Sequence, residues 1–197
     1  MSAHSTIISQ FDQECYLKIR NNVSKFLKDC AGKYDCEECL VLDIAPQIHE
    51  GAKAYFKKAK IETLDIDTNS GATYIADITK YNRVIPDKRF NIIVCTEVLE
   101  HTLNPLSAIK EIFRLLKPSG ILLLTVPFNF RIHGPLPDCW RFTEHGLREL
   151  LKKFYSIKIE SIATPNRNLM PIHYTVIAIK RSRSQKRHIS LSELFTI

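Results

Sequence analysis

Acidic residues stand at the ends of the first apolar, β-branched segments of the sequence. They are Asp43, Asp65, Asp67, Asp77 and Glu97, the last directly after Thr96. If these segments are neighbouring parallel strands, the carboxylates converge on one crevice, where like charges are costly unless something uses them. An acid after the second strand can accept hydrogen bonds from both hydroxyls of a ribose, and a group of carboxylates offsets the desolvation of a cation. The pattern predicts a site for a cationic cofactor that carries a ribose.

A second group of polar residues follows the fourth of these segments. Glu97, Glu100 and His101 lie at i, i+3 and i+4, on one face of a helical turn. This spacing suits a divalent metal ion, provided that a later histidine supplies a fourth ligand. No second histidine follows directly, so we expect no metal here. A structural, hydrogen-bonded side chain is the simplest interpretation of His101.

The segment HGPLPDCWRFT (133–143) has an unusual composition for a connecting loop. Two prolines stiffen it, and the single tryptophan, Trp140, stands beside Arg141 and close to Asp138. Aromatic faces pack against sugar rings, and Arg with Asp can bind hydroxyls or phosphates. The alternative is a lid held in place by a buried Trp140 and a structural ion pair between Asp138 and Arg141.

The elements that position these residues alternate between strands and helices, which predicts a doubly wound α/β fold with a mostly parallel seven-stranded sheet. The last two strands have only about ten residues between them and are therefore expected to be an antiparallel pair. Ligands of such sheets bind at the carboxyl ends of the strands. Strands are predicted at 39–45, 61–66, 72–78, 90–98, 121–128, 155–163 and 173–180, and helices at 5–28, 46–60, 105–116 and 143–154, the third closed by the glycine of KPSG.

The order of these segments resembles that of class I S-adenosylmethionine-dependent methyltransferases. The resemblance covers about residues 39–180 and is carried by VLDIA, TLDID, IADIT, FNIIVCTEVLEH, LLKPSG and ILLLTVPF. It implies a Rossmann-like methyltransferase fold and S-adenosylmethionine as the cofactor. The implied cofactor-binding residues are Asp43, Ala45, Asp65, Ile66, Asp77, Ile78, Thr96 and Glu97, with Asp67 as the alternative to Asp65.

The chain departs from the family after its first strand. The family has glycines where this chain has Ala45 and Pro46, and the first glycine here is Gly51. Glycine permits a positive φ and a close approach of the backbone to a ligand, whereas proline removes a backbone donor. Pro46 can instead begin a helix whose N-terminus attracts the cofactor's carboxylate. We expect the cofactor to be bound with altered loop geometry, because the downstream acids are retained.

The segment 133–143 also resembles a motif of methyltransferases associated with polysaccharide and sugar modification. That resemblance implies His133 as the leading general base, His101 as the second, and Asp138, Trp140 and Arg141 as substrate-binding residues. The expected reaction is O-methylation of a sugar or a sugar-bearing small molecule. Arg167, Asn168 and His173 either border the same site or are ordinary loop residues.

Composition favours one cytoplasmic globular domain. We expect a helical lead-in at 1–36, the methyltransferase domain at 37–181 and a basic tail at 182–197, with no secretory signal or membrane span. The six cysteines are expected to be reduced thiols, and Cys36 and Cys39 with Cys30 are an incomplete zinc set. The chain is compatible with a homodimer.

Two other functions remain open from the sequence. The formal net charge of +7 suggests an anionic partner, but much of it lies in the basic tail, which argues against a nucleic-acid methyltransferase. The loop without glycines and the apolar end LSELFTI allow a non-catalytic interaction module. An NAD dehydrogenase is disfavoured because no G-x-G-x-x-G follows any strand.

Overall fold

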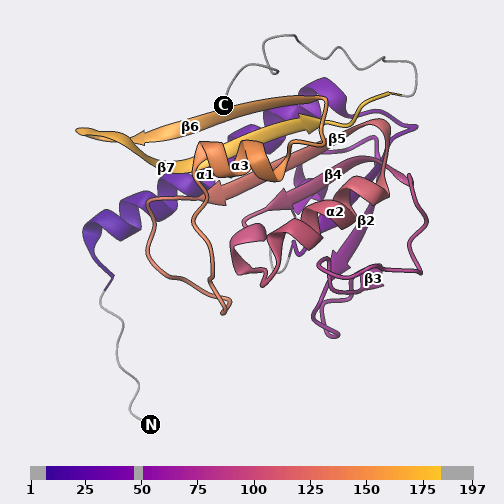
Figure 1. Cartoon of the computed structure of the whole chain (residues 1–197), viewed down its shortest axis with the longest axis horizontal. Helices are drawn as coiled ribbons and strands as arrows, with labels where there is room; N and C mark the ends of the chain where they lie inside the picture. The colour runs from indigo at the N-terminus through magenta and orange to yellow at the C-terminus, as the bar shows by residue number, and fades with distance from the viewer. Residues whose placement is uncertain (1–7, 47–50, 183–197) are drawn as a thin grey trace, which may run out of the picture.

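A computed structural model of the chain describes residues 8–46 and 51–182. Its centre is a seven-stranded sheet with the strand order β3-β2-β1-β4-β5-β7-β6 (Figure 1). The first five strands run parallel, whereas β7 is antiparallel to both β5 and β6. The predicted α/β sheet with a final antiparallel pair is therefore confirmed. The strands are β1 (Leu40–Ile44), β2 (Lys60–Asp65), β3 (Tyr74–Ile75), β4 (Phe90–Thr96), β5 (Leu116–Pro127), β6 (Ser156–Thr164) and β7 (Arg167–Ile179).

Helices cover both faces of the sheet. In Figure 1, α1 (Gln10–Tyr34) lies behind the strands, and α2 (Pro105–Leu115) and α3 (Glu144–Leu150) lie in front of them. Alternate strand residues serve the two sides: Val41 packs in the core under α1, and its neighbour Leu42 packs in the core under α2 and α3. This period of two is the reason that the buried strands read as continuous apolar runs. The strand order reverses between β1 and β4, where such sheets bind their ligands.

The ends of the helices follow local side-chain capping. Thr143 accepts a hydrogen bond from the backbone N–H of Gly146, which confirms the predicted start of α3. The predicted glycine cap of α2 is wrong, because Gly120 lies within β5. The Lys180 ammonium instead donates to the carbonyls of Phe113 and Leu116 at the end of that helix (2.5 and 2.7 Å). A buried lysine thus satisfies carbonyls that the helix leaves without partners.

Several predicted elements differ in extent from the observed ones: α1 ends at Tyr34 instead of residue 28, β5 begins at Leu116 instead of residue 121, and α3 ends at Leu150 instead of residue 154. Three further differences have an identifiable cause. In the described part of 46–60, the chain forms only a 3₁₀ turn at Gly51–Ala54, because the Asp35 carboxylate accepts the backbone N–H groups of residues 57–59. Strand β3 is shortened to two residues by a turn that begins at Asp77. Strand β7 starts at Arg167, since Asn166 takes the positive φ (58°) that a tight hairpin turn requires.

Two of the six cysteines are not free thiols. Cys36 and Cys39 form a disulfide just before β1, so the expectation of six reduced thiols is wrong for this pair. Cys15, Cys30 and Cys95 are buried, and Cys139 is exposed. The disulfide occupies two of the three sulfur atoms of the incomplete zinc set.

The described helices differ in length or polarity from those that span membranes. Among the described residues, none of them combines the length and the apolar content needed to cross a bilayer. The residues Arg183, Lys186 and Arg187 of the predicted basic tail lie outside the described part of the chain.

Candidate active site at the carboxyl ends of the strands

The turn after β1 explains why the first glycine comes late. Ala45 has a φ of 50°, so alanine takes the left-handed conformation that the family's glycine would adopt. The close approach is made by Gly51, which also has a positive φ (54°). A Cβ at Gly51 would lie 2.2 Å from Oδ2 of Asp43. The left-handed conformation and the close approach are thus found at Ala45 and Gly51, six residues apart in the sequence.

Asp43 lies in the sheet at the base of this turn. It is buried, and its Oδ2 accepts a hydrogen bond from the backbone N–H of Ala52 (2.7 Å). Burial raises the pKa of Asp43 to about 7, and the hydrogen bond from Ala52 opposes that shift. A carboxyl group in this state becomes ionised readily when a cation binds beside it.

Asp65 ends β2 and lines a cavity of about 700 Å³ together with Asp43 and Pro46. Its Oδ1 accepts the backbone N–H of Asp67, and no described residue donates to its Oδ2. Asp67 lies in an exposed turn, where its Oδ1 accepts the N–H of Asn69. The strand end, the burial and the free oxygen favour Asp65 over Asp67 as the ribose ligand, which stays a prediction.

Three other predicted cofactor-binding residues, Asp77, Ile78 and Ile66, are less directly placed. Oδ1 of Asp77 accepts hydrogen bonds from the backbone N–H and the hydroxyl of Thr79. The side chain of Ile78 is buried in the core, whereas Ile66 is 71% exposed beside Asp65. An exposed apolar residue at this place suits contact with a flat base, and the roles of all three stay predictions.

Glu97 begins the turn that follows β4, with a φ of 54°. Its Oε1 accepts hydrogen bonds from the Thr125 hydroxyl (2.8 Å) and from Nε2 of the buried His173 (2.7 Å). Nδ1 of His173 lies 2.9 Å from the side-chain amide nitrogen of Asn22 on α1. Burial acts to raise the pKa of Glu97, but the charge of His173 and these hydrogen bonds outweigh it and lower the pKa. His173 is therefore a positioning residue for Glu97.

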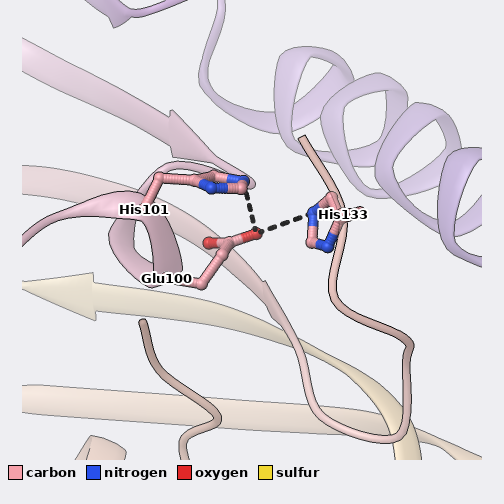
Figure 2. Close-up of side chains that lie close together, drawn as sticks. All are labelled: Glu100, His101 and His133. Atoms are coloured by element: carbon pink, nitrogen blue, oxygen red, sulfur yellow. Dashed lines mark ion pairs between the residues drawn. The ribbon is translucent and has the colours of Figure 1, made fainter. Parts of the chain in front are cut away.

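Glu100 and His101 follow on the 3₁₀ turn η2 (Leu99–His101). Glu100 is fully buried, and neither of its carboxylate oxygens has a hydrogen-bond partner. Burial, followed by the charge of Glu97, raises the pKa of Glu100 well above its ordinary value. Its Oε1 lies between the rings of His101 and His133, 3.8 and 3.9 Å from their Nε2 atoms (Figure 2). The two rings meet edge to face, with centroids 4.9 Å apart.

The loop that carries His133 is held by its own charged residues. The Arg141 guanidinium makes two hydrogen bonds to the carboxylate of Asp138 (2.5 and 2.7 Å) and also donates to the carbonyls of Phe130 and Arg131. Burial opposes the shift, but Arg141 lowers the pKa of Asp138 to about 2. Trp140 is 42% exposed and donates through Nε1 to the carbonyl of Thr102. These contacts position the loop, and the predicted substrate contacts of these residues stay predictions.

His101 and His133 line a second cavity, of about 440 Å³, which adjoins the first at Pro46. Ala45, Thr96 and Glu97 also line it, so it brings together most of the residues predicted from β1 and β4. None of Asp138, Trp140 and Arg141 is among the residues that line it. Helix α1 closes one side with Tyr16, Ile19, Arg20, Val23, Ser24 and Leu27.

Sequence reasoning missed the contribution of α1, which it treated as a lead-in. The available signal was the presence of Tyr16, Arg20 and Ser24 along an otherwise apolar helix face, at successive helical turns. It also gave no role to Gly51. That signal was a glycine eight residues after a strand-end acid, where the family has its glycines immediately.

The two adjoining cavities fit a cofactor with a ribose and a positive charge. One has two strand-end carboxyls, Asp43 and Asp65, and the other has the histidines. Oδ2 of Asp65, to which no described residue donates, can accept hydrogen bonds from ribose hydroxyls, and the carboxyls suit a sulfonium and an ammonium group. The residues present therefore fit S-adenosylmethionine.

Comparison with known proteins identifies the same chemistry. The profile of the family described as a methyltransferase domain matches residues 22–172. A ubiquinone biosynthesis O-methyltransferase of Actinobacillus pleuropneumoniae is 36% identical over 69 residues, which are 35% of this chain and 29% of that protein. The chain thus spans less than a third of the length of the curated relatives that it matches.

Solved structures share the fold at low sequence identity. An S-adenosylmethionine-dependent methyltransferase from Archaeoglobus fulgidus is 17% identical, with a TM-score of 0.61 over 84% of this chain and 94% of that one. Phosphoethanolamine N-methyltransferase 2 of Haemonchus contortus, in complex with S-adenosyl-L-methionine, is 16% identical, with a TM-score of 0.62 over 82% of this chain and 53% of that one. At these identities the likeness is one of fold.

Proposed function

We propose that this chain, which belongs to the methyltransferase-domain family and takes S-adenosylmethionine as its cofactor, methylates a hydroxyl group of a small molecule that carries a sugar. The observation that carries this proposal is the pair of histidines, His101 and His133, that line the cavity beside the end of β4. The relative named as an O-methyltransferase supports the choice of oxygen as the acceptor atom. Cytoplasmic location and a homodimer are further expectations of the same proposal.

The lining of the smaller cavity supports a hydroxylated acceptor. Tyr16, Tyr55 and Phe130 offer aromatic faces, and Arg20, Ser24, Thr96 and Glu97 offer hydrogen-bonding groups. Sugar rings use this combination, since their C–H faces pack on aromatics and their hydroxyls need polar partners. A cavity of about 440 Å³ is in the size range of small-molecule sites.

The cofactor supplies an electrophilic methyl group on a sulfonium sulfur. The acceptor oxygen forms a bond to that carbon as the S–C bond breaks, and the electron pair of that bond stays on sulfur. Before or during attack, the hydroxyl must lose its proton. Nδ1 of His133 lies 3.1 Å from the Asp138 carboxylate, so the neutral ring carries its proton there and Nε2 keeps a lone pair that can accept a proton. His133 is thereby oriented to receive the hydroxyl proton.

Substitution of Asp65 by alanine is expected to weaken cofactor binding by about 100-fold or more, because each hydrogen bond to a carboxylate contributes about 1.5–3 kcal/mol and about 1.4 kcal/mol is a factor of ten. Calorimetric titration with S-adenosylmethionine and S-adenosylhomocysteine measures the change. Asp67→Ala is the matched control and should bind both compounds like the native chain. Equal losses in the two variants would contradict the assignment of Asp65. If the native chain binds neither compound, the enzyme interpretation is wrong, and the alternative of a non-catalytic interaction module is supported.

Substitution of His133 by asparagine is expected to lower kcat by about 10²–10⁴-fold, the usual contribution of a positioned acid–base group. The affinity for S-adenosylmethionine should stay unchanged, because the predicted cofactor ligands lie on other elements. Methyl transfer to a panel of sugars, phenols and amines, followed with labelled cofactor, measures both the acceptor class and kcat. His145→Asn, on the exposed side of α3, is the control. Undiminished turnover in the His133 variant, or transfer to amines alone, would contradict the proposal.

A further inference from the structure

The carboxylate of Glu100 is the starting point of a further inference. Its side chain is 0% exposed, and both oxygens lack a hydrogen-bond partner. An unpaired buried carboxylate is costly, and native structures seldom retain one without a use. Its backbone carbonyl is well bonded, since it accepts the N–H groups of Cys139 and Trp140. The residue is thus firmly placed, and only its carboxylate is left without a partner.

The two histidines beside it are turned so that they cannot satisfy it in their neutral form. Nδ1 of His101 lies 3.1 Å from the carbonyl of Pro137, and Nδ1 of His133 lies close to the Arg131 carbonyl (3.3 Å) and to the Asp138 carboxylate (3.1 Å). Carbonyl and carboxylate oxygens only accept hydrogen bonds, so the proton of each neutral ring is on Nδ1. Two nitrogen lone pairs and the carboxyl group of Glu100 therefore face one another with no hydrogen bond among them.

We propose that Glu100, His101 and His133 bind a divalent first-row transition metal ion through Oε1 of the glutamate and Nε2 of the two histidines. The three residues each offer one ligand atom, and these atoms all lie within 4.8 Å of one another. Figure 2 shows the glutamate oxygen directed between the two rings. The site joins η2 to a loop residue that follows it by more than thirty positions, so no local histidine spacing marks it.

The chemistry of the donors selects the kind of ion. Two imidazoles and one carboxylate suit zinc, iron, cobalt or manganese, whereas magnesium and calcium prefer oxygen ligands. Metal–ligand bonds of about 2.0–2.2 Å place neighbouring ligand atoms about 3 Å apart. The separations of 3.8 and 3.9 Å to Glu100 therefore close by somewhat less than 1 Å on binding. Pro137 and Asp138 already fix the Nδ1 sides of the rings, as outer partners of metal-bound histidines do.

The site deepens the proposed function and rests on it for its role in catalysis. His101 and His133 line the smaller cavity, so the remaining coordination positions of a bound ion are open to an acceptor there. A coordinated hydroxyl has a lowered pKa and loses its proton to water, after which its oxygen attacks the methyl carbon as described above. When the ion is bound, Nε2 of His133 is one of its ligands and no longer the general base. The lowered pKa of the coordinated hydroxyl then replaces the action of that base.

Direct metal binding is the first test and needs no methyl acceptor. Untagged full-length protein is treated with EDTA, exchanged into buffer without reductant, and titrated separately with Mn²⁺, followed by electron paramagnetic resonance, and with Co²⁺, followed by visible absorption. We expect one saturable ion per chain. Mn²⁺ controls for metal binding by the cysteine thiolates, since thiolates favour softer ions than Mn²⁺. Mg²⁺ at the same concentration should not compete.

Glu100→Gln tests the assignment of the ligands. It removes the carboxylate ligand without changing the shape of the side chain, so it should fold and bind S-adenosylmethionine like the native chain. We expect its affinity for Mn²⁺ and Co²⁺ to fall by more than about 100-fold, because loss of even an outer partner of a metal ligand costs about 10–100-fold. Glu149→Gln, an exposed glutamate of α3, is the matched control. If Glu100→Gln fails to fold, His101→Asn replaces it.

The outcomes separate this inference from the proposed function. Saturable binding that is lost in Glu100→Gln, together with methyl transfer that EDTA stops and Mn²⁺ restores, supports both. If native protein binds no more Mn²⁺ or Co²⁺ than Glu100→Gln, the metal site is wrong, even where methyl transfer proceeds. Binding lost in Glu100→Gln without transfer to any hydroxyl acceptor supports the metal site and overturns the proposed function. Full activity of Glu100→Gln in EDTA overturns the role of the ion.

Discussion

Replacing Gly51 by alanine is expected to destabilise the protein by about 2–5 kcal/mol and to abolish tight cofactor binding. A left-handed φ costs a residue other than glycine about 1–2 kcal/mol, and forcing an extra group into packed surroundings costs about 1–3 kcal/mol. The added Cβ would lie 2.2 Å from Asp43 Oδ2 and 2.9 Å from Pro46 Cβ. The carboxylate cannot yield without breaking its hydrogen bond to the N–H of Ala52, and Pro46 borders both cavities.

Urea denaturation and calorimetric titration with S-adenosylmethionine measure the two effects. Gly32→Ala is the matched control, because Gly32 lies on the exposed side of α1 with no atom within 4 Å of an added Cβ. Alanine there should stabilise the helix by about 0.5–1 kcal/mol. If Gly51→Ala is as stable as the native chain and binds the cofactor equally well, the turn after β1 does not approach Asp43 as described.

The strands were predictable because each is a local, β-branched run with a polar end. Composition and order were enough to place the acids of β1, β2 and β4 at the same edge, since parallel strands share their carboxyl ends. The errors came where distant residues decide the conformation. Lys180 caps α2 in place of a glycine, and Asp35 ends the turn that was expected to be a helix. Neither contact leaves a trace in the local sequence.

In the candidate site, too, contacts within one turn could be predicted from the sequence, whereas contacts between distant segments could not. The spacing of Glu100 and His101 indicated a shared face, but the third member, His133, comes from another element, and only the fold brings it to the same carboxylate. A search for a histidine directly after His101 could therefore not find His133 as a neighbour of Glu100. Glu97, grouped with them by spacing, is instead bonded to His173 on β7. Residue spacing predicts which side chains share one face of a helical turn. It does not predict which distant residue each carboxylate contacts in the fold.

Asp43 gives the second large expected effect, a dependence of stability on pH. Its pKa in the folded protein is about 7, raised by burial from an ordinary value of 3.8. Between these two values the unfolded chain loses the proton while the folded chain keeps it, so the free energy of unfolding falls as pH rises from 4 to 7 and then levels off. Since one pKa unit corresponds to about 1.4 kcal/mol, Asp43 should account for up to about 4 kcal/mol of this fall.

Asp43→Asn removes the titrating group, so the variant should lose this part of the slope, as measured by urea denaturation at intervals from pH 4 to pH 8. Asp67→Asn, in an exposed turn, is the control and should keep the native slope. Cofactor binding adds an independent check, because a cation beside Asp43 favours its ionised form and should release a proton below pH 7. Titrations in buffers of different ionisation enthalpy count that proton, which Asp43→Asn should not release. Equal slopes and equal proton release in native protein and variant would show that Asp43 is ionised in the folded state throughout this range.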